Sequence, residues 1–184
     1  MKHQNSFILL SKKISISLFF AIFCSHLLLS IPVAAQINSK ALAFDALTIN
    51  DGLSQGMVNS ILQDKYGFMW FGSNDGLNRY DGNKFTVYKN DPNDNNSIAE
   101  NFIRFLFEDS QGRIWIATAG NGLDLFERTT ETFIHFKHEA KATNTISDNS
   151  ITSIREDAAG GIWIGTLHGL NRLVIKKRKN IKIE

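Results

Sequence analysis

Three aspartates recur at one fixed place in a repeated phrase, and carboxylates are the groups with which hydrolytic enzymes protonate, deprotonate or attack a bond. Asp64, Asp109 and Asp157 each lie six residues before a tryptophan. Paired catalytic carboxylates must face each other across the scissile bond, whereas copies of a repeat occupy equivalent places in separate structural units. We therefore predict that these aspartates end strands and fix turns by hydrogen bonding to their own backbone.

The three tryptophans of the chain repeat with the aspartates, and their aromatic faces could stack on sugar rings. Trp70, Trp115 and Trp163 each stand at the same place in their copy of the phrase. That regularity favours packing between neighbouring units, where each tryptophan buries a large area and needs a partner for one N–H. The leucine that follows each tryptophan is assigned to the same repeat core. These leucines are Leu77, Leu123 and Leu170.

Metal-binding patterns are weak. The run Asp91–Asn96 resembles a calcium loop, but its sixth position lacks glycine and its twelfth position, Phe102, is not glutamate. His135 and His138 have no third ligand nearby, and zinc needs three or four. The chain also has no phosphate loop, nucleophile elbow or CxxC motif. We expect no metal, no cofactor and no enzyme activity; an exported lyase or glycosidase is the least favoured alternative.

The elements that must position these residues are three copies of one unit. The tryptophans stand 45 and 48 residues apart, and a glycine lies three residues before each of them. A period of this length indicates stacked supersecondary units. Glycine accepts the positive φ that a tight turn requires, so we place one turn in each copy at this glycine. The turn glycines are Gly67, Gly112 and Gly160.

Four short strands fit into each copy, which is the content of one propeller blade. Apolar positions are mostly β-branched or aromatic, and no segment beyond residue 35 keeps a helical spacing. The predicted fold class is therefore all-β, with about three four-stranded antiparallel propeller blades in an incomplete ring. The predicted strands are 57–63, 68–72, 77–80 and 85–88; 102–107, 113–118, 122–126 and 132–136; and 151–154, 161–166, 169–173 and, least clearly, 174–183.

The predicted organisation follows from these strands. Residues 36–50 form an N-terminal segment whose stretch Phe44–Ile49 reads as one extra strand. The three blades follow it, and propellers close with about four to eight. We expect a segment of three blades to be poorly stable alone or to assemble with further blades, because its end faces expose apolar surface. The predicted blades are 51–94, 95–143 and 144–184.

Residues 1–35 have the anatomy of a secretory signal peptide. A basic start precedes the apolar stretch 14–31, and Val33-Ala34-Ala35 offers a cleavage site. An uncleaved membrane anchor is the alternative. The only cysteine, Cys24, lies in this segment, so the mature chain must be held together by packing alone. We expect export to the periplasm, or to the periplasmic face of the inner membrane if the segment is not cleaved.

The net charge argues against a nucleic-acid partner. The full chain has 20 Lys and Arg against 18 Asp and Glu, and removal of residues 1–35 removes three lysines and no acids, so the formal charge changes from +2 to −1. A near-neutral chain offers no electrostatic footprint for nucleic acid. The basic run 176–179 is read as charge on a strand edge that discourages aggregation, with a membrane-surface or nucleic-acid tail as the alternative.

The third copy resembles the two-component regulator propeller repeat. It reads Asn-Ser-Ile-Thr-Ser-Ile-Arg-Glu-Asp over 149–157, then Gly-Ile-Trp-Ile-Gly-Thr over 161–166, and Gly-Leu-Asn-Arg over 169–172. The resemblance covers residues 44–173. In the second copy Ala117 replaces a glycine, and Asp124-Leu125 replaces the Asn-Arg pair. The resemblance implies the exported sensor region of a bacterial signalling receptor with a histidine kinase or diguanylate cyclase as output, often for carbohydrate breakdown products.

Two functions from different classes follow from this resemblance. The first is a non-catalytic periplasmic sensor segment, the beginning of a longer receptor, that binds a small carbohydrate-type ligand on loops of one propeller face. The second is a structural or interaction module whose blades complete a ring with a partner chain or a second copy. The candidate loops are Ser73–Asp75, Ala119–Asn121 and Leu167-His168. The candidate ligand-binding residues in them are Asn74, Asn121 and His168.

Overall fold

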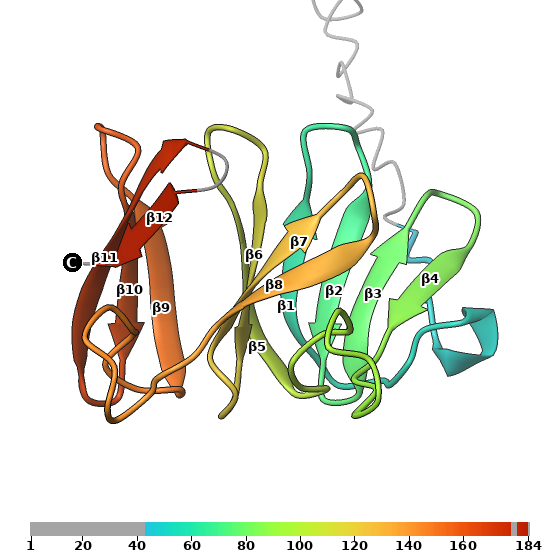
Figure 1. Ribbon diagram of the computed structural model, residues 1–184. Helices are drawn as coiled ribbons and strands as arrows, with labels where there is room; N and C mark the ends of the chain where they lie inside the picture. Colours follow the sequence, from blue (N-terminus) through green and yellow to red (C-terminus); the bar gives the residue numbers. More distant parts are fainter. Residues whose placement is uncertain (1–42, 178–179, 184) are drawn as a thin grey trace, which may run out of the picture. The chain divides into compact units, whose positions relative to one another are not determined.

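A computed structural model describes residues 43–177 and 180–183 of the chain. Its strands form three four-stranded antiparallel sheets, and each sheet follows sequence order (Figure 1). The all-β prediction is confirmed. The strands are β1 (Val58–Gln63), β2 (Met69–Ser73), β3 (Gly76–Tyr80) and β4 (Phe85–Tyr88); β5 (Ile103–Glu108), β6 (Ile114–Thr118), β7 (Leu123–Glu127) and β8 (Thr132–Phe136); β9 (Ile151–Glu156), β10 (Ile162–Thr166), β11 (Gly169–Lys177) and β12 (Asn180–Ile183).

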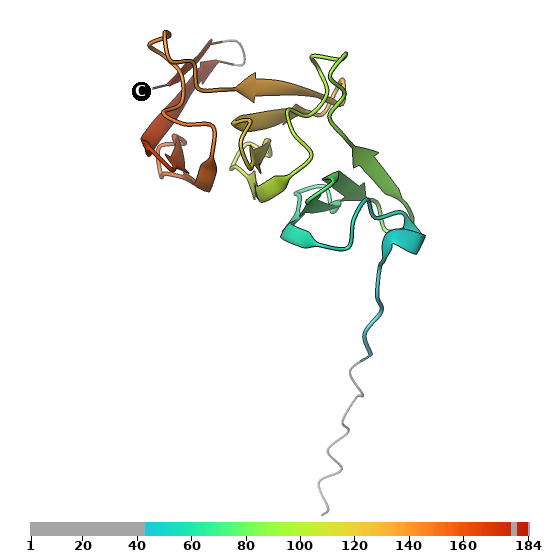
Figure 2. The same ribbon diagram turned by 90° about the horizontal axis from the view of Figure 1, so that it is seen from below.

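The first strands of the three blades lie next to one another, since β1 contacts β5 and β5 contacts β9. The fourth strands β4, β8 and β12 lie on the other side of their sheets, as the view from below shows (Figure 2). In an antiparallel sheet whose strands follow sequence order, successive turns lie at alternate ends of the strands. Turns from first to second and from third to fourth strand therefore share one end of the blade, and turns from second to third strand share the other end with the linkers between blades.

Register irregularities recur near the start of each first strand. The pairing shifts between Val58 and Ser60 in β1 and between Ile103 and Phe105 in β5. The third blade has its shift between Gly165 and Thr166, opposite the start of β9. A bulge of this kind bends a strand and increases its twist. The repeated bulge therefore sets how the exposed side chains at the start of each first strand are aimed.

The hydrophobic core lies between sheets rather than within one sheet. Trp70 and Leu77 of the first blade are fully buried with residues of the second, including Ile103 and Ile116. Trp115 of the second blade is buried in the same way against residues of the third blade. A Cβ at Gly72 would lie 2.6 Å from a side-chain carbon of Ile103, so a larger residue would force the first two blades apart.

Two residues assigned to the repeat core depart from it. Trp163 is 36% exposed and Leu170 is 65% exposed. Their counterparts in the first two blades are each covered by the next blade, and among the described residues no sheet follows the third blade on this side. Burial of these positions is thus a property of the blade–blade contact and not of the single repeat.

Two strand predictions are corrected. Residues 43–48 have no regular secondary structure, and a short 3₁₀ helix covers Ile49–Asp51, where the strand Phe44–Ile49 was expected. Thr48 and Asp51 bond each other's backbone as a capping box, which turns the chain before it can extend. In the third blade Val174 belongs to β11, and the fourth strand is the short β12.

Within the described ranges, no helix is long and apolar enough to cross a membrane. The predicted signal peptide, residues 1–35, and the start of the segment 36–50 lie outside the described residues, as do positions 178 and 179 of the basic run.

Candidate functional site

Each repeated aspartate organises the first turn of its blade. Asp64 Oδ1 accepts hydrogen bonds from the backbone N–H groups of Tyr66 and Phe68, both at 3.0 Å. Asp64 Oδ2 accepts a hydrogen bond from the indole N–H of Trp70 at 2.8 Å. Gly67 takes a φ of 91° in the same turn. The carboxylate thus joins the turn to the buried tryptophan in one node.

The same node recurs in the other blades. Trp115 Nε1 donates to Asp109 Oδ2 at 2.8 Å, and Trp163 Nε1 donates to Asp157 Oδ2 at 2.9 Å. The remaining turn glycines, Gly112 and Gly160, also have positive φ, at 75° and 80°. The aspartate starts the turn, and the tryptophan six residues later donates its indole N–H to that carboxylate. This bond explains the constant six-residue spacing.

A guanidinium completes each node, but it comes from three different elements. Arg128, in the turn between β7 and β8, reaches back to Asp64 of the preceding blade at 2.8 Å. In the second blade Arg113, the residue just before β6, bonds the aspartate of its own blade at 2.5 Å. In the third blade Arg172 of β11 does so at 2.8 Å. Each carboxylate has its charge balanced, as a buried carboxylate requires.

Hydrogen bonding favours the ionised form of Asp64 and of Asp157. Burial raises the pKa of Asp64, but hydrogen bonds from Trp70 and Arg128 outweigh it and leave the pKa below its usual value. The backbone N–H of Gly161, followed by the indole of the node, holds the pKa of Asp157 well below its usual range. A carboxylate with a lowered pKa and several fixed hydrogen bonds is suited to structure rather than to proton transfer near neutral pH.

The histidines that raised the question of zinc have separate partners. His135 Nδ1 lies 2.6 Å from Asp124 Oδ1 and its Nε2 lies 2.9 Å from the carbonyl of Asn95. His138 Nδ1 lies 2.8 Å from the carbonyl of Ile146. In the part of the chain that the structure describes, no three His, Cys, Asp or Glu side chains are grouped to hold a metal.

The run considered for calcium forms turns. Asp91 Oδ1 accepts the backbone N–H of Asn93 at 2.9 Å, and Asp94 Oδ1 accepts that of Asn96 at 2.9 Å. Each aspartate mimics a backbone turn in this way. These bonds shape the linker between the first two blades.

The three candidate loop residues occupy equivalent turns between second and third strands. Asn74 is engaged on both sides of its amide: its Oδ1 accepts from Asn59 Nδ2 at 2.7 Å, and its Nδ2 donates to Met57 Sδ at 3.1 Å. His168 Nδ1 lies 2.7 Å from Asp148 Oδ2, while three quarters of its side chain is exposed.

Asn121 differs from the other two loop residues. Its backbone N–H bonds Glu100 Oε2 at 3.2 Å and Thr118 Oγ1 at 3.0 Å. Among the described residues its side-chain amide has no hydrogen-bond partner, so it is available to a ligand. The turn that carries it is anchored by the bond from Ala119 N–H to the carbonyl of Phe102 at 3.0 Å.

These turns adjoin an open hollow beside the starts of the first strands. It has a volume of about 400 Å³ and draws on β1, β5 and β9. Asn59 lines this hollow and also bonds the turn residue Asn74. The loop prediction and the hollow thus mark one end of the blades. The lining residues are Asn59, Phe102, Arg104, Phe105, Ile151 and Thr152.

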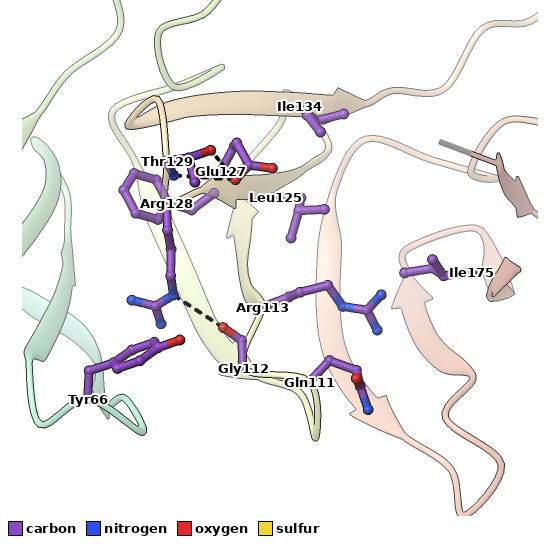
Figure 3. A pocket seen from close by; sticks show the side chains of 11 residues that line it. Tyr66, Gln111, Gly112, Arg113, Leu125, Glu127, Arg128, Thr129, Ile134 and Ile175 are labelled. Atoms are coloured by element: carbon purple, nitrogen blue, oxygen red, sulfur yellow. Dashed lines mark hydrogen bonds between the residues drawn. The ribbon is translucent and has the colours of Figure 1, made fainter. Parts of the chain in front are cut away.

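A second cavity, of about 250 Å³, lies at the opposite end of the second blade, next to the turns from first to second and from third to fourth strand (Figure 3). The guanidinium of Arg128 stacks over the ring of Tyr66 at 4.8 Å and bonds the carbonyl of Gly112. Leu125 and Ile134 supply the apolar wall. The guanidinium of Arg128, which lines this cavity, is therefore already bonded to the carbonyl of Gly112 and to Asp64.

Comparison with known proteins identifies the class. The family described as Two component regulator propeller matches residues 52–75, 97–120 and 145–168, one segment in each blade. The chain carries three repeats of this family, and the resemblance drawn from the repeated phrase is confirmed.

The relatives are signalling proteins. The chain is 40% identical over 85 residues to Histidine kinase P4 of Formosa agariphila. The aligned segment covers 46% of this chain and 6% of the kinase. The extracellular domain of a hybrid two component system from B. thetaiotaomicron matches 76% of this chain and 19% of its own at 32% identity, with a TM-score of 0.68. The extracellular domain of a one component system from the same organism matches 71% of this chain and 18% of its own length. The identity is 30% and the TM-score is 0.58.

The chain therefore spans less than a fifth of the length of these relatives. Both solved relatives are extracellular domains, which agrees with export. A streptogramin B lyase also shares the fold, with a TM-score of 0.50 at 17% identity, and that likeness concerns the fold alone.

Sequence reasoning missed the bond between each repeated aspartate and its tryptophan. The constant spacing was visible, and an indole N–H that needs a buried partner could have been matched to the only carboxylate common to all copies. It also missed Arg104 and Phe102, because single exposed residues in one copy carry no repeated signal.

Proposed function

We propose that this chain is a non-catalytic ligand-recognition segment of an exported bacterial signalling receptor, located in the periplasm and binding a small carbohydrate-type ligand. The relatives supply the class, and the ligand-binding role is our inference. The observation that carries it is the hollow beside the turns of the first two blades, lined by exposed polar and aromatic side chains. Its polar groups differ from blade to blade, whereas the core positions beside them are alike.

In this function Asn121 and His168 contact the ligand, and Asn74 holds Asn59 in place. A ligand at this end would alter signalling only as far as it binds one receptor arrangement more tightly than another. Loops carried by a rigid β-scaffold are common places for such recognition.

Binding of a panel of neutral and acidic oligosaccharides to the purified chain tests the proposal. Asn121→Ala and His168→Ala should each weaken binding of the best ligand about tenfold, which corresponds to the loss of one or two hydrogen bonds. Asn83→Ala, in the turn at the opposite end of the first blade, is the matched control and should leave affinity within twofold. Unchanged affinity in both loop variants would overturn the assignment of these loops.

A second candidate function rests on the exposed face of the third blade. Trp163 and Leu170 present apolar surface there, and the same face of the first two blades is covered by a following blade. An interaction module would use this face to complete a propeller with further blades. Sedimentation velocity of the chain with and without Leu170→Glu distinguishes the two functions, because only an interaction module requires the face for its activity.

A further inference from the structure

We propose that the hollow beside β1, β5 and β9 binds the carboxylate of an acidic sugar, with Arg104 as the anion-binding residue and Phe102 as the ring-stacking residue. This inference rests on the proposed ligand-recognition function and names the ligand class and the residues that select it.

Arg104 is an uncommitted cation. It is exposed on β5, and in the described part of the chain it makes no ion pair and no hydrogen bond. By contrast Arg79, Arg113, Arg128 and Arg172 each pair with a carboxylate. No acidic residue lines the hollow around Arg104. A guanidinium fork with free donors matches a carboxylate with two parallel hydrogen bonds.

Comparison of the three blades singles out this position. Asn59, Arg104 and Thr152 each lie eleven residues before the tryptophan of their blade and are exposed on adjacent first strands. The residue before each of them is β-branched, and Ile103 and Ile151 are buried whereas Val58 is half-buried. The core positions thus keep one chemistry, while the exposed positions present an amide, a guanidinium and a hydroxyl side by side.

Phe102 adds an aromatic surface at the same place. It is 39% exposed, although its backbone carbonyl is fixed by the bond from Ala119. The equivalent positions in the other blades are Met57 and Ser150, so this ring is specific to the second blade. An anchored, partly exposed aromatic face beside a free guanidinium suits a sugar ring that carries an anionic group.

The remaining polar atoms fit hydroxyl groups. Asn59 Nδ2 donates to Asn74 Oδ1 and to the carbonyl of Ile103 at 2.9 Å, so both of its N–H groups are used and its Oδ1 is left as an acceptor. The hydroxyl of Thr152 has no hydrogen-bond partner among the described residues and can donate or accept. The hollow therefore offers one anion site flanked by one acceptor and one hydroxyl.

Isothermal titration of the full chain with a galacturonic acid trisaccharide tests the inference, with the neutral galactose trisaccharide of the same linkage as the comparison. We expect tighter binding of the acidic sugar, and affinity that falls as salt rises. Arg104→Gln should weaken it at least tenfold, Arg104→Lys should restore part of the loss, and Phe102→Ala should weaken both sugars. Arg155→Gln, another exposed arginine on β9, should stay within twofold.

The outcomes separate the inference from the function on which it rests. Neutral binding that depends on Asn121 but not on Arg104 overturns the inference and keeps the function. If a galactose trisaccharide that carries sulfate groups in place of the carboxylates binds equally well and also depends on Arg104, the carboxylate assignment is overturned. If no saccharide binds the folded chain, both are overturned. The melting temperature of Arg104→Gln should match that of the unmodified chain, since Arg104 has no partner to lose.

Discussion

Glu156 of the third blade holds the first turn of the second blade, because its Oε2 accepts the backbone N–H of Ser110 at 2.7 Å and its Oε1 accepts the Ser110 hydroxyl at 2.7 Å. Glu108 serves the first blade in the same way, accepting the backbone N–H of Lys65 at 3.0 Å. The glutamate that precedes the repeated aspartate is thus a connection between blades. Its counterpart in the first blade is Gln63, an amide rather than a carboxylate.

Loss of this connection should destabilise the chain measurably. Glu156→Ala removes two charge-assisted hydrogen bonds, and we expect the free energy of unfolding to fall by about 1–3 kcal/mol. Urea denaturation followed by tryptophan fluorescence measures this change. Gln63→Ala, at the equivalent place of the first blade, is the control and should cost less than half as much. Equal losses would mean that the glutamate bonds add nothing to the contact between blades.

The node of the second blade should cost more to break than the node of the third blade. Asp109→Ala leaves the indole of Trp115 and the guanidinium of Arg113 without their acceptor in a buried place, so we expect a loss of about 3–5 kcal/mol. Asp157→Ala removes the same bonds beside the half-exposed Trp163, where water can replace the carboxylate, and should cost about 1–2 kcal/mol. Thermal unfolding of both variants measures the difference, and a reversed order would contradict this account of the nodes.

Leucine truncation should depend on which blade carries it. Leu77→Ala removes a fully buried side chain and should cost about 2–5 kcal/mol. Leu170→Ala changes a side chain that is 65% exposed and should stay within about 0.5 kcal/mol. Paired urea melts check this contrast. A large loss in Leu170→Ala would show that something covers the end face of the third blade in solution.

Acid should destabilise the fold through the nodes. The folded-state pKa values of Asp64 and Asp157 lie below their usual value, so their stabilisation is present above the unfolded pKa of about 4 and is lost as pH falls through the folded values. We expect the melting temperature to drop steeply below about pH 4. Asp157→Asn should make that slope shallower. An unchanged slope would assign acid sensitivity to other carboxylates.

A histidine should give the chain a second pH dependence of opposite sign. Both ring nitrogens of His135 face acceptors, Asp124 and the carbonyl of Asn95, so the charged imidazolium satisfies both. The hydrogen bond to Asp124 raises the pKa of His135 despite partial burial. Its stabilisation is therefore complete below about pH 6.5 and is lost as pH rises through the raised folded value.

The first blade supplies the control for this histidine. It has Asn78 paired across strands with Val87, where the second blade pairs Asp124 with His135. The double variant Asp124→Asn, His135→Val should remove the loss of stability that sets in as pH rises above about 6.5. Melting temperatures across this range measure it. If the double variant keeps the slope, the histidine is not its source.

Much of the fold could be predicted from the sequence because each blade repeats its own turn and core pattern. The strand prediction for 85–88 agrees with β4 residue by residue, since an Asp-Gly turn and alternating apolar residues fix both ends. The exposure of Leu170 could not be predicted, because the repeat specifies which face of a blade is apolar but not whether a neighbouring blade covers that face. The strand expected at Phe44–Ile49 failed for a related reason: extended backbone needs a paired edge.

The candidate site was only partly predictable. The turns that carry Asn74, Asn121 and His168 follow from the period, because equivalent turns must gather at one end of the blades. Which of these side chains stays free does not follow, since Asn74 is bound by Asn59 from a neighbouring strand. The sequence could not single out Arg104. A lone exposed arginine becomes a candidate anion-binding residue only when the structure shows that no acidic residue lines the hollow around it.

The different origins of Arg128, Arg113 and Arg172 make the blades unequal as building blocks. A gene duplication that copied the second or third blade would carry its own countercharge with it. A copy of the first blade would lose Arg128, the arginine that Asp64 takes from the following blade, and would bring only Arg79 of its own β3, which pairs with Glu131 of the second blade. Asp64 and Arg79 of the first blade thus both depend on the blade that follows, whereas the nodes of the second and third blades are complete within one blade.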